Sequence, residues 1–551
     1  MPDRKATPGS QTSPSVDQTP TISDDESLPP HTSEIGTLKK LPNHGTAWLG
    51  SSSGVYFVNT VRRAFSAAFS VSAQGANVPA TEDILTGEDD QGRSYNGPVT
   101  EGTNNDSLQQ LLAGSLGRLP ERTLATELVM SFFKLWHPLF PFLHGPTFLR
   151  DMESLYPATT QQGSPSGSRT SSTTQSQSQS DNNSPIDPRK MITFQLVINI
   201  ASLDRSDLHL PDESRIKTTA DVTRVAACMT INHDIATIQA LLAAELYLVA
   251  TLAIRQASTV AGIILKLIYH AGLHRCPLRY AQLSLEDCEI RKRIFWSAYA
   301  LDRHCSLSLG DPITVQDSDI DVCLSGRELH QAVAADVLDH QSHLPGREIA
   351  LPGTIPGAAT ARSGLVSAQG HRDVGTEDPR VTNDGPEARE KALREAALTA
   401  YVNHGKLTGR IIEIFHKSIH ARFPRQEQIL ALTADIETWW NDLPGFLSGE
   451  NAAEMAQQQQ KLAPFFALLY QRLLLLLSRP RLSLDQTTAE FQHGLQVCIK
   501  ASRNIISSLK KHQAQGQSMF LPGCLSATWM AGLIVAFACQ LGKYPKTRAC
   551  S

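Results

Sequence analysis

The first residues to test for chemistry are two histidines, His270 and His274, that stand four positions apart. That spacing places two imidazoles on one face of a helix, as in zinc peptidases, where an acidic residue beside the first histidine serves as the base. Here the intervening sequence is Ala-Gly-Leu and holds no carboxylate. Gly272 favours a left-handed stop at this point. We therefore predict the end of a helix rather than a zinc site.

Three other candidate sites have ordinary structural explanations. His137 and His144 stand beside prolines with no acidic or cysteine partner at ligand spacing, so we expect them to be hydrogen-bonded or exposed. The acidic run 88–90 lies in a glycine-flanked segment and predicts a solvated loop. The Gly/Ser cluster 50–54 lacks the Gly-Lys-Ser/Thr ending of a phosphate loop and predicts a turn.

The cysteines do not form a dense framework. All nine lie at or after Cys228, most of them inside helical patterns: 228, 276, 288, 305, 323, 498, 524, 539 and 550. Scattered thiols of this kind are expected to be reduced, intracellular and mostly buried. The sequence also offers no nucleophile–base pair and no metal triad at usable spacing. We predict no catalytic, metal or cofactor-binding residue and no cofactor.

The candidate residues lie on a stretch of predicted helices, 237–324. Apolar residues recur at steps of three and four in two successive runs, 238–252 and 260–271, which predicts two buried helices. Ser284 with Asp287 three positions later resembles a capping box that opens a third helix. Gly310 and Pro312 should end it.

The third helix is predicted to be amphipathic. Asp287 should face Arg291, and Glu289 should face Arg293, each pair at i,i+4. The opposite face carries an apolar stripe made of Ile290, Ile294, Ser297, Ala298 and Leu301. The acidic pairs make this basic run a solvated helix face rather than a phosphate-binding patch.

Five short motifs along this stretch carry a family resemblance: 271–275 (AGLHR), 289–296 (EIRKRIFW), 301–303 (LDR), 309–312 (LGDP) and 319–322 (DIDV). In this order and spacing they resemble the middle homology region of fungal-specific transcription factors. Segments near His137-Pro138, Trp439–Pro444 and Ser478–Pro480 resemble further parts of that region, so the resemblance covers most of the ordered chain. The motif positions that we expect to be mainly structural are His274, Arg275, Arg291, Arg293, Trp296, Asp302, Arg303, Gly310 and Pro312.

The resemblance implies an all-α regulatory domain of many helices that, in this family, follows a DNA-binding Zn2Cys6 cluster. Such a cluster needs a compact array of cysteine thiolates, and no cysteine precedes Cys228. The basic pairs 39–40 and 62–63 are sparse, and the formal charge is -4. We expect DNA to be contacted only indirectly or through an N-terminal module missing from this sequence. Zinc would be needed only by that module.

Composition divides the chain into segments. Residues 1–43 are rich in Ser, Thr and Pro and predict disorder, as does the Ser/Gln/Thr insertion 158–187. Linkers are expected at 71–120 and 325–388. The remaining ranges are a short ordered segment at 44–70 and the two halves of the helical domain at 121–324 and 389–551.

Two apolar runs, 462–477 and 525–541, were tested as membrane spans. The first is short and contains Arg472, and the second carries several polar residues and glycine. Both fit helices buried in the domain better than membrane spans. The N-terminal residues have neither the apolar core of a signal peptide nor the Arg-rich pattern of a transit peptide. We expect no membrane association.

Two classes of function remain. The first is a nuclear transcriptional regulator of a fungal gene set, such as a metabolic or secondary-metabolite cluster. It would act with other regulators, among them a zinc-cluster protein, and would respond to a small-molecule effector. It would be a clusterless co-regulator or the product of a truncated gene model. The second class is a small-molecule-binding protein or enzyme on an all-helical fold. The family resemblance favours the regulator.

Overall fold

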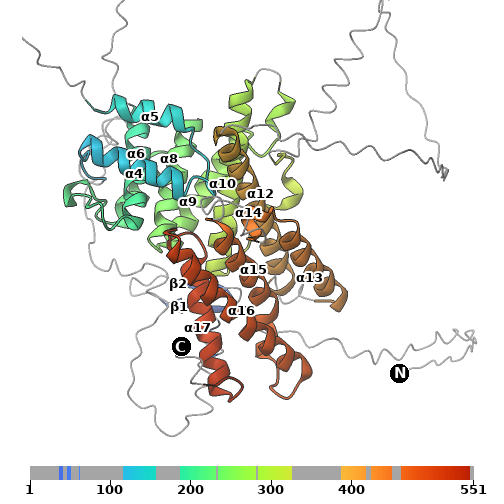
Figure 1. The fold of residues 1–551 in the computed structure, drawn as a ribbon. Helices are drawn as coiled ribbons and strands as arrows, with labels where there is room; N and C mark the ends of the chain where they lie inside the picture. The colour runs from blue at the N-terminus through green and yellow to red at the C-terminus, as the bar shows by residue number, and fades with distance from the viewer. Residues whose placement is uncertain are drawn as a thin grey trace, which may run out of the picture.

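The structure is a computed structural model, and it describes residues 36–40, 46–50, 57, 61, 116–156, 187–230, 234–280, 283–324, 386–416, 424–449 and 461–545. Within these ranges the fold is all-helical apart from one short hairpin, which confirms the predicted class (Figure 1). The segments predicted as disordered insertion and central linker lie almost wholly outside the described residues. The 88–90 loop and residues 51–54 of the Gly/Ser turn lie outside them as well.

The first half of the domain begins with four helices. They are α4 (Arg122–Leu135), α5 (Gly145–Ser154), α6 (Pro188–Asp204) and α7 (Thr219–Cys228), with a short η1 (Asp212–Ser214) before α7. Sequence-coded caps start two of them: the Asp187 carboxylate accepts from the backbone N–H of Arg189, and the Thr218 hydroxyl accepts from that of Asp221.

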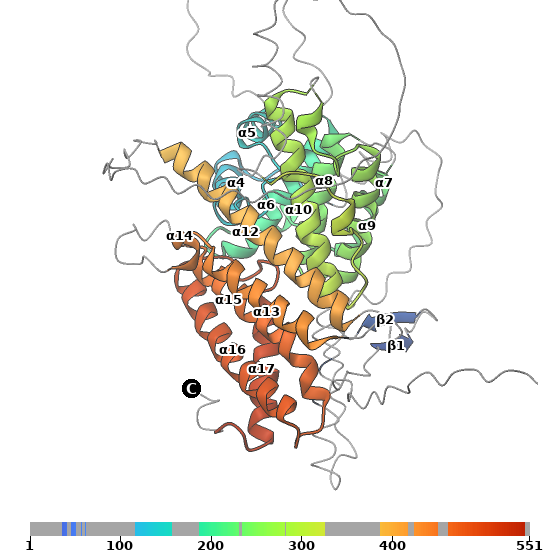
Figure 2. The same cartoon turned by 90° about the vertical axis from the view of Figure 1, so that its right-hand side faces the viewer.

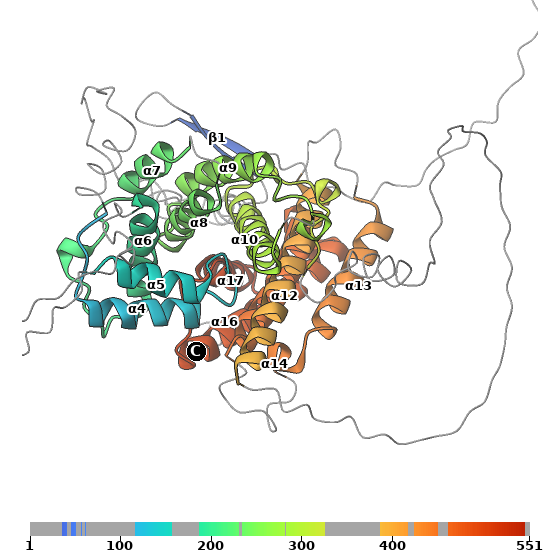
Figure 3. The same cartoon turned by 90° about the horizontal axis from the view of Figure 1, so that it is seen from above.

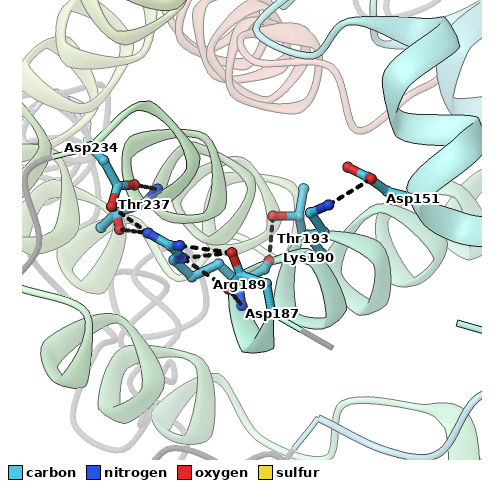
Figure 4. Close-up of polar contacts among 7 residues, drawn as sticks. All are labelled: Asp151, Asp187, Arg189, Lys190, Thr193, Asp234 and Thr237. Atoms are coloured by element: carbon cyan, nitrogen blue, oxygen red, sulfur yellow. Dashed lines mark hydrogen bonds and ion pairs between the residues drawn. The ribbon is translucent and has the colours of Figure 1, made fainter. Parts of the chain in front are cut away.

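The N-terminus of α6 is fastened to its neighbours by ion pairs (Figure 4). The Arg189 guanidinium binds the Asp187 carboxylate at 2.7 Å and also contacts Asp234, the cap of α8 (Ile235–Ala250). The Lys190 ammonium binds the Asp151 carboxylate of α5 at 2.8 Å. Hydrogen bonds from Arg189 outweigh the effect of burial and lower the pKa of Asp187. These charged side chains bind one another and hold α5, α6 and α8 together.

The helices predicted from periodicity are present. α8 is followed by α9 (Ile254–His270), and the turn between them places Leu252 at a φ of 64°. η2 (Pro277–Arg279) then leads to α10 (Leu285–Leu309) and η3 (Asp317–Asp319). Seen from above, α10 lies between α9 and α12 (Pro386–Phe415) (Figure 3).

The second half is built on α12, which runs diagonally along both halves of the domain (Figure 2). It is followed by α13 (Gln426–Asn441), α14 (Gly445–Ser448), α15 (Ala463–Ser478), η5 (Arg479–Ser483), α16 (Ala489–Ala514) and α17 (Cys524–Gln540). The two apolar runs tested as membrane spans are α15 and α17, and each buries a large share of its side chains inside the domain. No helix among the described residues is long and apolar enough to cross a membrane.

Two glycines let α12 lie directly on α10. A Cβ at Gly405 would lie 3.2 Å from the Tyr299 ring, and a Cβ at Gly409 would lie 3.1 Å from Arg303 Nε. Side chains at these positions would push the helices apart, because the atoms they meet are themselves buried. The central contact between the two halves therefore depends on a Gly-x-x-x-Gly spacing in α12.

The N-terminal part contributes a hairpin and two anchors. β1 (Gly36–Lys40) pairs antiparallel with β2 (Thr46–Gly50), so part of segment 1–43 is a strand although its composition predicts disorder. Phe57 and Val61 are buried, as the apolar pattern of 44–70 predicts. The Phe57 ring contacts Phe537 of α17 edge to face at 6.4 Å between centroids.

Candidate functional site

The motif helix α10 begins and ends where its sequence predicts. The Ser284 hydroxyl oxygen accepts from the backbone N–H of Asp287 at 3.1 Å, and Gly310 closes the helix with a φ of 76°. The charged partners agree with the prediction only in part. The Glu289 carboxylate binds Lys292 at 2.5 Å, while Arg293 Nε donates to the Glu289 backbone carbonyl at 3.4 Å. The charge of Glu289 also acts on Arg293, as predicted, in addition to its ion pair with the buried Lys292.

Arg291 also differs from the prediction. Its guanidinium approaches the backbone carbonyl of Ala271 at 3.5 Å, whereas Asp287 accepts from the Ser284 hydroxyl at 2.8 Å. Arg291 thus helps to hold the end of α9 against α10. Ile290, at the start of the apolar stripe, is only partly buried, while α10 from Ile294 to Leu307 is buried on every side. The amphipathic pattern therefore describes only the first turns of this helix.

A buried ion-pair network surrounds Arg303, whose side chain is 2% exposed. Its guanidinium donates to the Asp302 carboxylate at 2.9 Å, to the Val315 carbonyl at 2.7 Å and to the Asp317 carboxylate at 2.8 Å. The Tyr299 hydroxyl donates to the same Asp317 oxygen at 2.7 Å, and the guanidinium lies 4.3 Å from the Tyr299 ring centre. The network fastens the segment after Pro312 to α10.

Trp296 fixes the next part of that segment. Its indole N–H donates to the Cys323 carbonyl at 3.3 Å, and the ammonium of Lys406 lies 5.2 Å from the ring centre. The Cys276 thiol lies 3.7 Å from the Cys323 sulfur, and its backbone N–H donates to Asp321 at 2.8 Å. These contacts hold the segment around Cys323 against α10.

The histidines tested as metal ligands have other partners. α9 ends at His270, Gly272 has a φ of 67°, and the His274 ring contacts Tyr269 edge to face at 5.1 Å. His137 Nε2 is hydrogen-bonded to the Leu143 carbonyl at 2.9 Å, and His144 Nδ1 to the Thr147 hydroxyl at 2.8 Å. Burial lowers the pKa of His137 to about 3, so the ring is neutral.

The cysteines are mostly buried and carry free thiols in the part of the chain that the structure describes, as predicted. Their distribution does not fit a zinc cluster, because the described cysteines are spread over several helices and connections, with Cys288 and Cys305 on α10 and Cys524 and Cys539 on α17. No group of three or more His, Cys, Asp or Glu side chains among the described residues could hold a metal ion.

Residues that the sequence analysis did not assign line a partly open cavity of about 90 Å³ where the two halves of the domain meet. Its walls come from the α8–α9 turn, the end of α10, α15 with η5, the loop before α17, and α17 itself. Most lining side chains are apolar. The charged and titratable side chains in the wall are His304, Arg472 and Arg479.

Arg472 is buried in this wall, with a side chain 8% exposed, and burial lowers its pKa. The groups that act on its charge are Tyr401 and Cys524, and burial raises the pKa of both, that of Cys524 to about 12. Both are therefore neutral near pH 7. The one signal in the sequence was a single arginine inside the leucine-rich run 468–477.

Buried titratable groups gather near this wall. His304 and His404 are both buried, and burial together with the charge of Arg472 lowers the pKa of each to about 3. His304 Nδ1 and His404 Nε2 have no hydrogen-bond partner. Glu245 is fully buried without a partner for either carboxylate oxygen, and burial followed by the charge of Asp302 raises its pKa well above the usual range.

Comparison with known proteins identifies residues 129–328 as a fungal specific transcription factor domain. The chain is 38% identical over 545 residues to a probable transcription factor, FUP6, of Fusarium proliferatum, covering 95% of this chain and 73% of that protein. It is 21% identical over 391 residues to the transcriptional activator protein acu-15 of Neurospora crassa. It is 26% identical over 215 residues to an ABC-transporter-regulating transcription factor of Aspergillus oryzae.

Coverage of these relatives is uneven. The match takes in 68% of this chain but 33% of acu-15, and 38% of this chain but 21% of the Aspergillus protein. No solved structure matches the chain. The motifs of α10, their buried structural roles and the extended match to FUP6 agree, and together they show that this chain belongs to the fungal-specific transcription factor family and is a transcriptional regulator.

Proposed function

We propose that the chain acts in the nucleus as the regulatory domain of a transcription system and controls a limited set of fungal genes, such as a metabolic or secondary-metabolite cluster. The observation that carries the proposal is the match to FUP6 over 95% of this chain, which includes both halves of the helical domain. In the structure the two halves meet along α10 and α12.

DNA contact is assigned to a partner or to a separate DNA-binding module. The described cysteines cannot form a zinc cluster, and the chain carries 54 acidic against 50 basic side chains. The basic residues of α10 are engaged within the fold: Lys292 binds Glu289, and Arg303 binds Asp302 and Asp317. Without clustered, available cations a protein binds DNA weakly and without sequence preference.

The proposal is tested by transcript profiling of a deletion strain together with a gel-shift series across salt concentrations. Loss of the gene should change a limited set of transcripts. The purified chain should show only weak, salt-sensitive and sequence-indifferent binding to promoter DNA. An added zinc-cluster protein from the same nucleus should bring the chain onto specific promoters.

Two results would overturn the two parts of the proposal separately. Unchanged transcripts in the deletion strain would reject control of a gene set in the tested conditions. Tight and sequence-selective binding by the purified chain would reject the need for a partner. Elemental analysis provides an independent check, because the dispersed cysteines predict no stoichiometric zinc in the purified chain.

A further inference from the structure

We propose that the cavity between α10, α15 and α17 binds a small monocarboxylate with an apolar body, and that this ligand is the effector of the regulator. The role of this ligand as effector rests on the proposed function. The binding site itself rests on geometry alone. Three features of the cavity point to this ligand: a buried cation, an open helix N-terminus beside it, and walls that are otherwise apolar.

The buried cation is Arg472. Its side chain lines the cavity, is more than nine-tenths buried, and makes no ion pair with a carboxylate of the described residues. A buried charge without a counter-ion is costly, and a helix of leucines offers no compensation. The cost is offset if an anion with two acceptor oxygens enters, because a guanidinium binds a carboxylate through two parallel hydrogen bonds.

The N-terminus of α17 lies directly against this guanidinium. Gly523 caps the helix with a φ of 100° and has no side chain to bind the first-turn N–H groups, and no acidic residue stands in that turn. A Cβ at Gly523 would lie 2.8 Å from Arg472 Nη1, so a larger residue would displace the arginine. The positive end of a 17-residue helix and a buried cation thus meet at one point of the wall.

His304 adds a neutral polar group to the same wall. Its side chain is 7% exposed, and its Nδ1 has no hydrogen-bond partner. A neutral imidazole can donate one hydrogen bond to a carboxylate oxygen without adding a second positive charge. Arg479, the other cation of the wall, lies over the Phe57 ring at 5.7 Å from its centre. One unpaired cation favours a ligand with a single negative charge.

The remaining walls favour an apolar body. They include Leu307, Leu475, Leu476, Phe520, Trp529 and Met530. An inorganic anion or a dicarboxylate would leave these surfaces uncovered or would bring a charge without a partner. A monocarboxylate would place its head at Arg472 and its chain along the apolar side chains.

The position of the cavity explains how such a ligand would regulate. The α8–α9 turn and the end of α10 belong to the first half of the domain, whereas Arg472 and α17 belong to the second. A ligand that contacts both halves stabilises the arrangement in which they are joined. It does so to the extent that it binds this arrangement more tightly than one in which the halves are separated. Occupancy of the cavity would therefore control how the domain is presented to a partner.

The test uses the purified full chain with monocarboxylates of increasing length, from butanoate to decanoate, and measures affinity by calorimetry and the thermal unfolding midpoint. At least one of them should bind and raise the midpoint. Octan-1-ol, octyltrimethylammonium and sulfate, which lack either the anionic head or the apolar body, should not. Arg472→Met should weaken carboxylate binding at least tenfold.

The matched control is Arg503→Met, which removes the same charge from an exposed position on α16. It should bind like the parent. The proposal is overturned if no monocarboxylate binds, if octan-1-ol stabilises as well as octanoate, or if Arg472→Met and Arg503→Met bind equally. If Arg472→Met does not fold, Arg472→Lys replaces it, because lysine keeps the charge but not the two parallel donors.

The effector role fails separately from the proposed function. Binding in vitro together with an Arg472→Met strain whose target transcripts match the parent strain would keep the site and reject its role as effector site. A deletion strain with unchanged transcripts would reject the gene-set proposal whatever the cavity binds.

Discussion

Two buried arginines in this protein have opposite surroundings. Arg303 on α10 donates to two carboxylates and a backbone carbonyl, so its charge is compensated inside the fold. Arg472 on α15 is also buried, but it faces a cavity and has a helix N-terminus next to it. The difference shows that burial alone does not define the role of a charge. A compensated arginine holds segments together, and one that faces a cavity without a counter-ion is available to a ligand.

The sharpest test of this comparison is the substitution Arg303→Met. Removing one partner of a buried pair leaves Asp302 and Asp317 without their main donor, which should lower the free energy of unfolding by about 3 to 5 kcal/mol. Urea denaturation at pH 7.5 measures the change. Adding Asp302→Asn should recover part of the loss, because the uncompensated charge is then removed. A loss below about 1 kcal/mol would mean that the network does not fasten the segment.

The second prediction concerns Trp296, which lies on α10 like Arg303. Trp296→Ala should lower the free energy of unfolding by about 3 kcal/mol, the lower end of the usual range, because the Lys406 side chain over the ring can settle into the space. Trp296→Phe should lose less. A variant with the parent's stability and no regulatory effect would instead place Trp296 in a partner-binding surface.

The sequence predicted α10 well, because the signals that define this helix are local. Helix periodicity, the Ser284 cap and the Gly310 stop depend on residues within a few positions of one another, and these elements formed as expected. The partner predicted for Arg291 was wrong, because its guanidinium approaches the Ala271 carbonyl, which the end of α9 brings near. The family motifs then showed which helices form one domain.

The cavity could not be predicted, because its wall joins residues from four distant segments. His304 and Arg472 stand 168 positions apart (472 − 304), and neither belongs to a motif that specifies the other. A lone arginine in a leucine-rich run shows that a charge is buried, but only the packing of α17 shows what it faces. The hairpin was missed for a related reason, since strand pairing depends on two segments and not on composition alone.

The third prediction uses Glu245, a fully buried carboxyl group near Asp302 whose pKa is raised by burial and then by that neighbour. A folded pKa above the unfolded value means that stability is complete below the unfolded pKa and is lost as pH rises toward the folded one. Glu245→Gln should therefore be more stable than the parent, by more than about 1 kcal/mol at pH 8, and the advantage should shrink toward pH 4. Urea titrations from pH 4 to pH 8 measure it, and a constant difference across this range would contradict the assignment.

The smallest effect on stability is expected for Arg472→Met. This variant tests directly whether Arg472 differs from Arg303 in its role. Methionine fills similar volume and removes a costly uncompensated charge, so the free energy of unfolding at pH 7.5 should rise, by no more than about 1 kcal/mol. Burial and then Arg472 hold the pKa of His304 and His404 at about 3, below the ordinary 6.5. Groups with a lowered pKa stabilise the fold above their unfolded pKa, and that stability is lost as pH falls. Without Arg472 the two histidines should be less depressed, so the variant should lose less stability than the parent as the pH falls below 5 toward the folded pKa of about 3. Arg503→Met should follow the parent throughout, and a loss at pH 7.5 as large as that of Arg303→Met would show that Arg472 is a structural arginine as well.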